Sequence, residues 1–132
     1  MKVKELMIGD WVLSNDLNIP VKVRSIMNHY TGSVCFYYDT SEYIVDDFKL
    51  EPIPLTPEIL EKNGFGFIDT YNGEFNSVWT GWWILDGLEL GCCDNSKFPV
   101  FFNIADTNVK VNYVHELQHA LKLCKIEKEI VL

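Results

Sequence analysis

The sequence predicts an α+β protein in which a small β-barrel is followed by an antiparallel β-meander packed with two helices. Short apolar runs separated by turn residues recur between positions 11 and 45, which favours a small barrel. A second series of such runs at 65–104 is typical of a meander of hairpins. The segments 57–63 and 113–124 instead carry the capping signals or the apolar spacing of helices.

The first module is expected to occupy residues 1–52. Turn residues at Asn15-Asp16, Thr31-Gly32 and Asp39-Thr40 separate its apolar runs. The opening run Leu6-x-x-Gly9-Asp10-Trp11-Val12 resembles the first strand of SH3-like barrels of the KOW type, and this resemblance implies an SH3-like β-barrel. The expected strands are 11–14, 21–27, 34–38 and 42–45.

The second module, residues 53–132, begins in a proline-containing connector that favours extended backbone. Thr56 is suited to the N-cap of a helix at 57–63, and Asn63-Gly64 is suited to its end. We expect the two modules to behave as one compact unit. The further elements expected are strands near 66–71, 74–79, 82–85, 88–93 and 98–103, a helix at 113–124 and a short last strand at 129–132.

The composition argues against a nucleic-acid-binding protein. The 132 residues include 11 basic and 19 acidic side chains, which gives a formal net charge of −8. A surface of this sign repels a phosphate backbone, and no cluster of Lys and Arg interrupts it. Weak nucleic-acid binding through the barrel remains as a functional possibility besides the two considered below, and such binding would weaken steeply with salt.

The sequence also favours a cytoplasmic protein. The N-terminus lacks the long apolar stretch of a signal peptide, and no apolar run approaches the roughly 18 residues that span a bilayer. With 48% hydrophobic residues, the chain is expected to fold without disulfides or metal. We therefore expect its four cysteines, Cys35, Cys92, Cys93 and Cys124, to be reduced thiols.

Three segments resemble a group of small uncharacterised proteins encoded in prophages and mobile elements of gut bacteria. The segments are Leu6-x-x-Gly9-Asp10-Trp11-Val12, Ile53-Pro-Leu-Thr-Pro-Glu-Ile-Leu-Glu-Lys-Asn-Gly-Phe65 and Tyr113-Val-His-Glu-Leu-Gln118. The resemblance extends over nearly the whole length of the chain. It implies a bacterial, intracellular accessory protein without indicating an activity.

The run His115-Glu116-Leu117-Gln118-His119 has the H-E-x-x-H pattern of zinc peptidases. On a helix, this spacing places two imidazoles one turn apart for Zn²⁺, with the glutamate as general base for a zinc-bound water. Catalytic zinc also requires a third protein ligand, and Lys122 and Lys125 replace the Gly and His of the metzincin continuation. Cys92 or Cys93 would supply that ligand only in the manner of peptide deformylases, whose Gly-rich motif is missing here.

Helical geometry favours a structural interpretation of this run. At about 100° per residue, six mostly apolar side chains share one arc that must face the core. His115 and His119 fall on the opposite side with Lys122, so we expect both imidazoles to lie in solvent. We predict no cofactor, and zinc bound by His115 and His119 only under the alternative of a minimal zinc-dependent hydrolase or peptidase with Glu116 as base. The side chains of the arc are Tyr113, Val114, Leu117, Ala120, Leu121 and Cys124.

Aromatic residues are concentrated in the second module and supply the candidates for partner binding, Trp79, Trp82 and Trp83. Adjacent side chains on a strand point to opposite faces, so Trp82 and Trp83 cannot both enter one core. The outward one could pack within the chain, contact a protein partner or a second copy, or line a sugar site. The sequence favours a non-enzymatic binding or accessory protein that acts through protein contact and does not contact a membrane.

Overall fold

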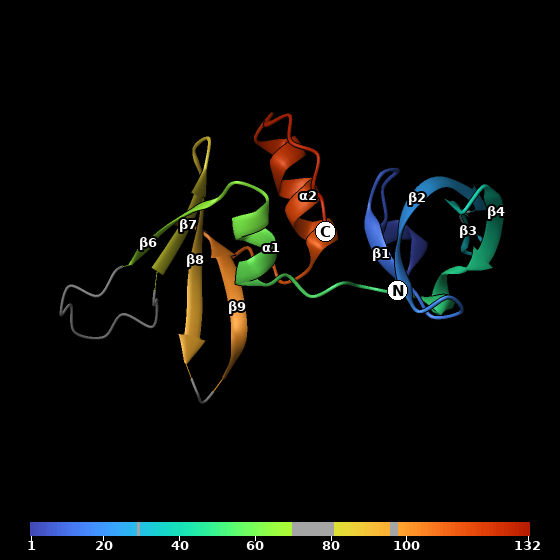
Figure 1. Ribbon diagram of the computed structural model, residues 1–132, viewed down its shortest axis with the longest axis horizontal. Coiled ribbons are helices and arrows are strands. Elements are labelled where there is room, and N and C mark those ends of the chain that lie inside the picture. Colours follow the sequence, from blue (N-terminus) through green and yellow to red (C-terminus); the bar gives the residue numbers. More distant parts are fainter. Residues whose placement is uncertain (29, 70–80, 96–97) are drawn as a thin grey trace. The chain divides into compact units, whose positions relative to one another are not determined.

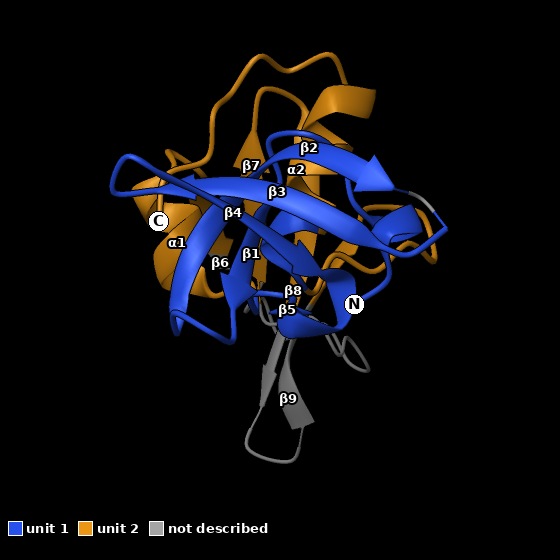
Figure 2. Ribbon diagram, turned by 90° about the vertical axis from the view of Figure 1, so that its right-hand side faces the viewer, with its two compact units in different colours: residues 1–54, 113–115 blue, residues 55–112, 116–132 orange. Residues whose placement is uncertain are grey.

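The computed structural model describes residues 1–28, 30–69, 81–95 and 98–132 (Figure 1). Over these residues it contains nine strands in two antiparallel sheets and two α-helices, which confirms the α+β class. The chain divides into two compact units, which Figure 2 distinguishes by colour. Unit 1 consists of residues 1–54 and 113–115, and unit 2 consists of residues 55–112 and 116–132.

Unit 1 contains a five-stranded sheet in the order β4-β3-β2-β1-β5, with every neighbouring pair antiparallel. The four strands expected from the sequence are confirmed, and β5 is additional. A strand of two residues that pairs with the distant β1 leaves no local pattern, so the sequence does not predict it. The elements are η1 (Val3–Glu5), β1 (Trp11–Ser14), β2 (Ile19–Asn28), β3 (Ser33–Tyr38), β4 (Ser41–Asp46), η2 (Asp47–Lys49) and β5 (Leu50–Glu51), where η denotes a 3₁₀ turn.

Alternate side chains of these strands form the core of unit 1. Val12 and Val34 are fully buried, and each buried side chain of this size contributes roughly 1.5–3 kcal/mol. The core cluster consists of Val3, Leu6, Val12, Val21, Val23, Val34, Phe36 and Leu50. β4 and β5 stand at the two ends of the strand order, and no pairing between them closes the sheet within the described residues.

The segment before β1 is shaped by Gly9 and Asp10. Gly9 adopts a φ of +95°, which residues other than glycine rarely adopt. Its N–H donates to the Val23 carbonyl at 2.8 Å. The buried carboxylate of Asp10 accepts the N–H of Met7 at 2.8 Å. This turn sets the direction in which the chain enters β1.

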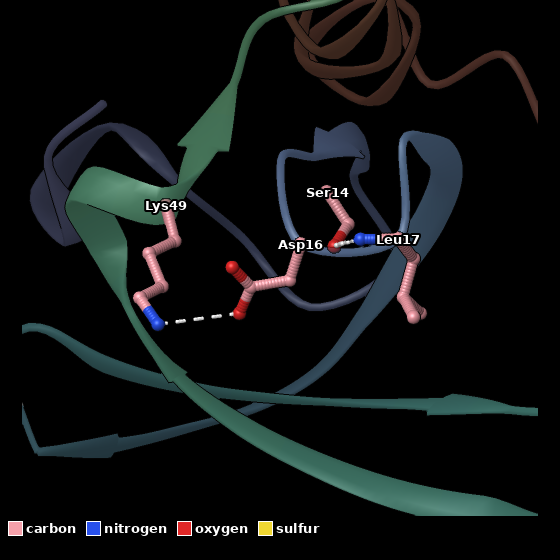
Figure 3. A network of polar contacts seen from close by, with 4 residues as sticks. All are labelled: Ser14, Asp16, Leu17 and Lys49. Carbon is pink, nitrogen blue, oxygen red and sulfur yellow. Dashed lines mark hydrogen bonds and ion pairs between the residues drawn. The ribbon is translucent and has the colours of Figure 1, made fainter.

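The turn between β1 and β2 is tied to the segment that leads into β5 (Figure 3). Ser14 Oγ accepts the N–H of Leu17 at 3.2 Å, and the N–H of Asn15 donates to the Lys49 carbonyl at 2.9 Å. The Lys49 Nζ and Asp16 Oδ2 atoms form an ion pair at 3.3 Å, with side chains 42% and 49% exposed. A pair this exposed contributes about 0–1 kcal/mol, so the backbone bonds define the turn more than the charges do.

Unit 2 contains a four-stranded antiparallel sheet in the order β6-β7-β8-β9. Its strands are β6 (Gly66–Asp69), β7 (Gly81–Leu85), β8 (Leu88–Asn95) and β9 (Phe98–Ile104). They correspond to four of the five strands expected in the meander. The fifth, expected near 74–79, lies outside the described residues.

The first helix of unit 2, α1 (Pro57–Lys62), follows the signals expected from the sequence. Thr56 Oγ1 accepts the N–H of Ile59 at 3.3 Å, as an N-cap does, and Pro57 occupies the first helical position. The helix ends at Asn63, after which Gly64 adopts a φ of +85°.

The second helix, α2 (Val114–Leu123), agrees with the expected helix at 113–124 to within one residue at each end. Val114 and Leu117 are fully buried, and Ala120 and Leu121 are at most 5% exposed, which confirms the core-facing part of the predicted arc. Tyr113 precedes the helix and Cys124 follows it, and both are exposed. Neither α1 nor α2 combines the length and apolar character that crossing a bilayer requires.

The prediction of a last strand at 129–132 is wrong, because this segment bonds to a side chain rather than to a sheet edge. The buried Asn63 donates from Nδ2 to the carbonyls of Ile59 and Val131, both at 2.8 Å, and its Oδ1 accepts the N–H of Val131 at 2.8 Å. The asparagine amide thus satisfies both backbone groups of Val131 in the place of a neighbouring strand.

Replacing Asn63 should therefore destabilise the protein. Asn63→Ala removes three hydrogen bonds and leaves the Val131 N–H and carbonyl without these partners, so we expect a loss of about 1–3 kcal/mol in unfolding free energy. Urea denaturation followed by circular dichroism measures it. Glu61→Ala, an exposed change on the same helix, should shift stability by less than about 0.5 kcal/mol. Equal effects of the two substitutions would contradict the assigned role of Asn63.

Candidate functional site

The H-E-x-x-H run lies in the first two turns of α2, but the expectation that both imidazoles lie in solvent is wrong. His115 is only 6% exposed, and the ring of Tyr113 stacks on it with centroids 5.9 Å apart and planes 16° from parallel. His119, one turn later, is half-buried. His115 departs from the expectation of the helical wheel because it lies in the first turn of α2. There the ring of Tyr113, just before the helix, covers it.

Glu116 acts as a cap of α2. Its Oε1 accepts the backbone N–H of Asn112, two residues before the helix begins, at 3.0 Å. This reach-back of a glutamate in the first turn is similar to a capping box, but it bonds one residue further out and so ties the chain before the helix to its first turn. A carboxylate there also interacts favourably with the positive end of the helix dipole.

The donor set around the two histidines does not complete a catalytic zinc site within the described part of the chain. No three side chains of His, Cys, Asp or Glu come together there in a group that could hold a metal ion. Cys92, one of the two proposed third ligands, lies buried on the core face of β8. The side chain of Cys93, the other proposed third ligand, lies outside the described residues.

An apolar groove borders the outer part of the run. It has a volume of about 210 Å³ and lies between α2 and the segment that follows β9. Glu116 and His119 are its polar lining from the run, and Leu123 is 84% exposed at its edge. The lining residues are Ile104, Val109, Lys110, Val111, Glu116, His119, Ala120 and Leu123.

The thiol of Cys35 has an altered acidity. Burial raises the pKa of this thiol, and the hydrogen bond from its Sγ to Glu42 Oε1 at 3.4 Å raises it further. The thiol therefore stays protonated at neutral pH. A catalytic cysteine requires the opposite shift, toward the thiolate.

The two adjacent tryptophans of β7 face opposite sides of the unit 2 sheet. Trp83 is 8% exposed, lies opposite Leu90 and packs against the ring of Phe67 with centroids 4.9 Å apart. Trp82 is half-buried and lies on the other face, opposite Gly91. Trp79 lies outside the described residues.

A row of residues across the sheet leaves a recess beside Trp82. Strand pairing aligns Ile68 of β6, Trp82 of β7, Gly91 of β8 and Asn103 of β9 on one face of the sheet. Residues directly opposite each other on neighbouring strands point the same way. Because Gly91 has no side chain, the space between Trp82 and Asn103 is not filled from β8.

The recess is a hollow of about 430 Å³ lined by Trp82 and the segment 103–108. We call it the Trp82 hollow. Its size falls within the range of about 300–1,000 Å³ of small-ligand sites. The sequence indicates Trp82 as a candidate but gives no sign of Asp106 or Asn108, because their approach to Trp82 depends on strand register.

The wall opposite Trp82 is held by its own hydrogen bonds. Asn103 Nδ2 donates to the carbonyls of Ile104 and Thr107, and Thr107 Oγ1 donates to the Ile104 carbonyl at 2.9 Å. The Ile104 N–H donates to the Val109 carbonyl at 2.9 Å, which closes the hairpin. Asp106 occupies its tip with a φ of +59°. The hollow therefore has a rigid wall.

Comparisons of this chain with protein-family models, with curated proteins and with solved structures found no match.

Substitutions of the two histidines should differ in their effect on stability. His115→Ala removes a buried, stacked ring, so we expect a loss of about 1–3 kcal/mol in unfolding free energy, whereas the half-buried His119 should contribute less. Zinc content of protein purified without a His-tag should be the same in the wild type and both variants. Stoichiometric zinc that is lost in both variants would instead establish the pair as ligands.

Alkylation should distinguish the thiols. Near neutral pH, iodoacetamide should modify the exposed Cys124 well before Cys35, because Cys35 is both buried and held in the protonated state by its raised pKa. Peptide mass spectrometry over time measures the order, and the same reaction in denaturant serves as control. Equal rates of Cys35 and Cys124 in the folded protein would contradict the raised pKa.

Proposed function

We propose that this chain is a non-enzymatic binding protein that acts through contact with a protein partner at the Trp82 hollow. The observation that carries this proposal is the half-buried Trp82 beside a recess of about 430 Å³ on the sheet face opposite the core of unit 2. Tryptophan is enriched among the residues that dominate binding energy at protein interfaces, especially where it lies beside a pocket.

The rigidity of the recess supports the same proposal. A wall already held by internal hydrogen bonds loses little conformational freedom when a partner binds, so more of the contact energy appears as affinity. A second copy of the chain is the less favoured partner, because two molecules with a net charge of −8 repel each other.

The context of this function is also part of the proposal. Unit 1 as an SH3-like barrel is supported by its short antiparallel strands, the first of which, β1, pairs with the last, β5. Free thiols at Cys35, Cys92 and Cys124 support a reducing, cytoplasmic location. An accessory role in a bacterial prophage or mobile element follows from the three resembling segments.

The alternative, a minimal zinc-dependent hydrolase or peptidase, has one observation in its favour. Glu116 and His119 line the same groove of about 210 Å³, so a base and a ligand of the H-E-x-x-H run share one recess. It still needs a third donor from outside the described residues. The zinc measurement on the histidine variants decides between the two functions.

Trp82→Ala should weaken partner binding by about tenfold or more, the usual effect of removing a tryptophan that anchors an interface. Immobilised wild-type protein captures candidate partners from an extract of the bacterial host, and titration calorimetry with the purified partner then measures affinity. Phe48→Ala is the matched control, because Phe48 is an aromatic residue that is 68% exposed in unit 1.

The proposal requires a purified pair that associates, a loss of affinity in Trp82→Ala and no loss in Phe48→Ala. Near-ultraviolet circular dichroism confirms that each variant is folded. If no purified candidate binds, or if the two variants bind equally well, the Trp82 hollow is not the contact site.

A further inference from the structure

We infer that the Trp82 hollow accepts an arginine side chain of the partner protein. This inference rests on the proposed function and specifies the chemistry of its ligand. It is carried by three features of the hollow: an aromatic wall, oxygen acceptors on the opposite wall, and the sign of the charge around it.

Trp82 supplies the aromatic wall. The electron-rich indole attracts a cation placed over it, and among aromatic side chains tryptophan does so most strongly. A planar guanidinium also stacks on an aromatic ring, which a compact ammonium group does not. The unit 1 sheet shows the same pairing in this chain, where the Arg24 guanidinium lies 5.0 Å from the ring centroid of Tyr37.

Oxygen acceptors face Trp82 from the hairpin. The exposed carboxylate of Asp106 lies at the tip, where it can receive two N–H groups of a guanidinium. The Nδ2 atom of Asn103 already donates to two carbonyls, which leaves its amide oxygen as the group with capacity for a ligand N–H. Asp106 and Asn103 thus offer oxygen acceptors to a cationic ligand in the hollow.

The charge around the hollow has the sign that favours a cation. Among the described residues, its lining contains one carboxylate, Asp106, and no Lys or Arg. Glu89 adds a second carboxylate nearby, since its exposed side chain shares the outer face of β8 with Gly91, and its carbonyl accepts the Ala105 N–H at 3.0 Å. A net charge of −8 further attracts a basic partner over longer range.

A neutral sugar would be a poorer occupant than arginine. It could stack on Trp82 and donate hydroxyl hydrogen bonds to Asn103 and Asp106, but, being uncharged, it would gain no charge attraction from the two carboxylates. An arginine engages the ring and Asp106 together, since its flat head and long stem allow stacking and a paired hydrogen bond with a carboxylate.

Blocked tripeptides test the inference directly on the full chain. Acetyl-Gly-Arg-Gly-amide is titrated into ¹⁵N-labelled protein, and we expect shifts of the Trp82 indole N–H and of the amides of 103–108. The citrulline peptide, which has nearly the same shape without the charge, should bind at least about tenfold more weakly. Added salt should weaken the binding of the arginine peptide and leave the binding of the citrulline peptide unchanged. Methyl α-glucoside is the neutral polyol probe.

Asp106→Asn removes the carboxylate and should lower the affinity for the arginine peptide by about tenfold. Asp86→Asn is the matched control, because Asp86 is also an exposed turn aspartate of unit 2 with a positive φ, +47° against +59° for Asp106. Asparagine tolerates this conformation, so both variants should retain the fold. Asp86→Asn should bind the arginine peptide like the wild type.

The inference is overturned by several results: no shift near Trp82, equal binding of the citrulline peptide, binding of the glucoside instead, or equal effects of the two aspartate variants. These failures are distinct from failure of the proposed function. If Trp82→Ala lowers the affinity for the protein partner while arginine peptides do not bind, the Trp82 hollow remains the contact site but its ligand is not arginine. If arginine peptides bind but Trp82→Ala leaves the affinity for the partner unchanged, the hollow binds arginine without being the contact site, and both the proposed function and the inference about the partner are overturned.

Discussion

The register of β7 on β8 is the constraint on which the candidate site depends. Trp83 lies opposite Leu90, and burial of two such side chains contributes roughly 1.5–3 kcal/mol each, which fixes this pairing. Side-chain alternation then places Trp82 on the opposite face, where Gly91 adds nothing that could fill the space toward Asn103. A slip of one residue would exchange the two tryptophans and remove the hollow.

The H-E-x-x-H run shows how one sequence pattern can serve two physical purposes. In a zinc peptidase the glutamate activates a water, whereas Glu116 here bonds to the Asn112 N–H and completes the start of α2. The preceding His115 is covered by Tyr113, which lies just before the helix. Both roles follow from the position of these residues in the first turn of α2, and neither requires a metal.

Local signals predicted α1 and every described strand except β5, whereas features that depend on distant partners were not predictable. Thr56 and Gly64 cap α1 within a few residues of sequence, so they could be recognised directly. By contrast, the 129–132 segment has the composition of a strand but bonds to Asn63, nearly 70 positions earlier. The approach of Asp106 to Trp82 likewise depends on pairings across β7, β8 and β9, which no local pattern contains.

The three segments that resemble prophage proteins contain residues of the framework and not residues of the Trp82 hollow. They contain residues with structural roles: Asp10 holds the turn before β1, Asn63 holds the last residues, and Glu116 caps α2. Trp82 and Asp106 lie outside all three segments. The three segments therefore bear on the framework of the fold and carry no information on the partner. Under the proposed function, recognition depends on the chemistry of the hollow, where an aromatic ring lies beside the oxygen acceptors of Asn103 and Asp106.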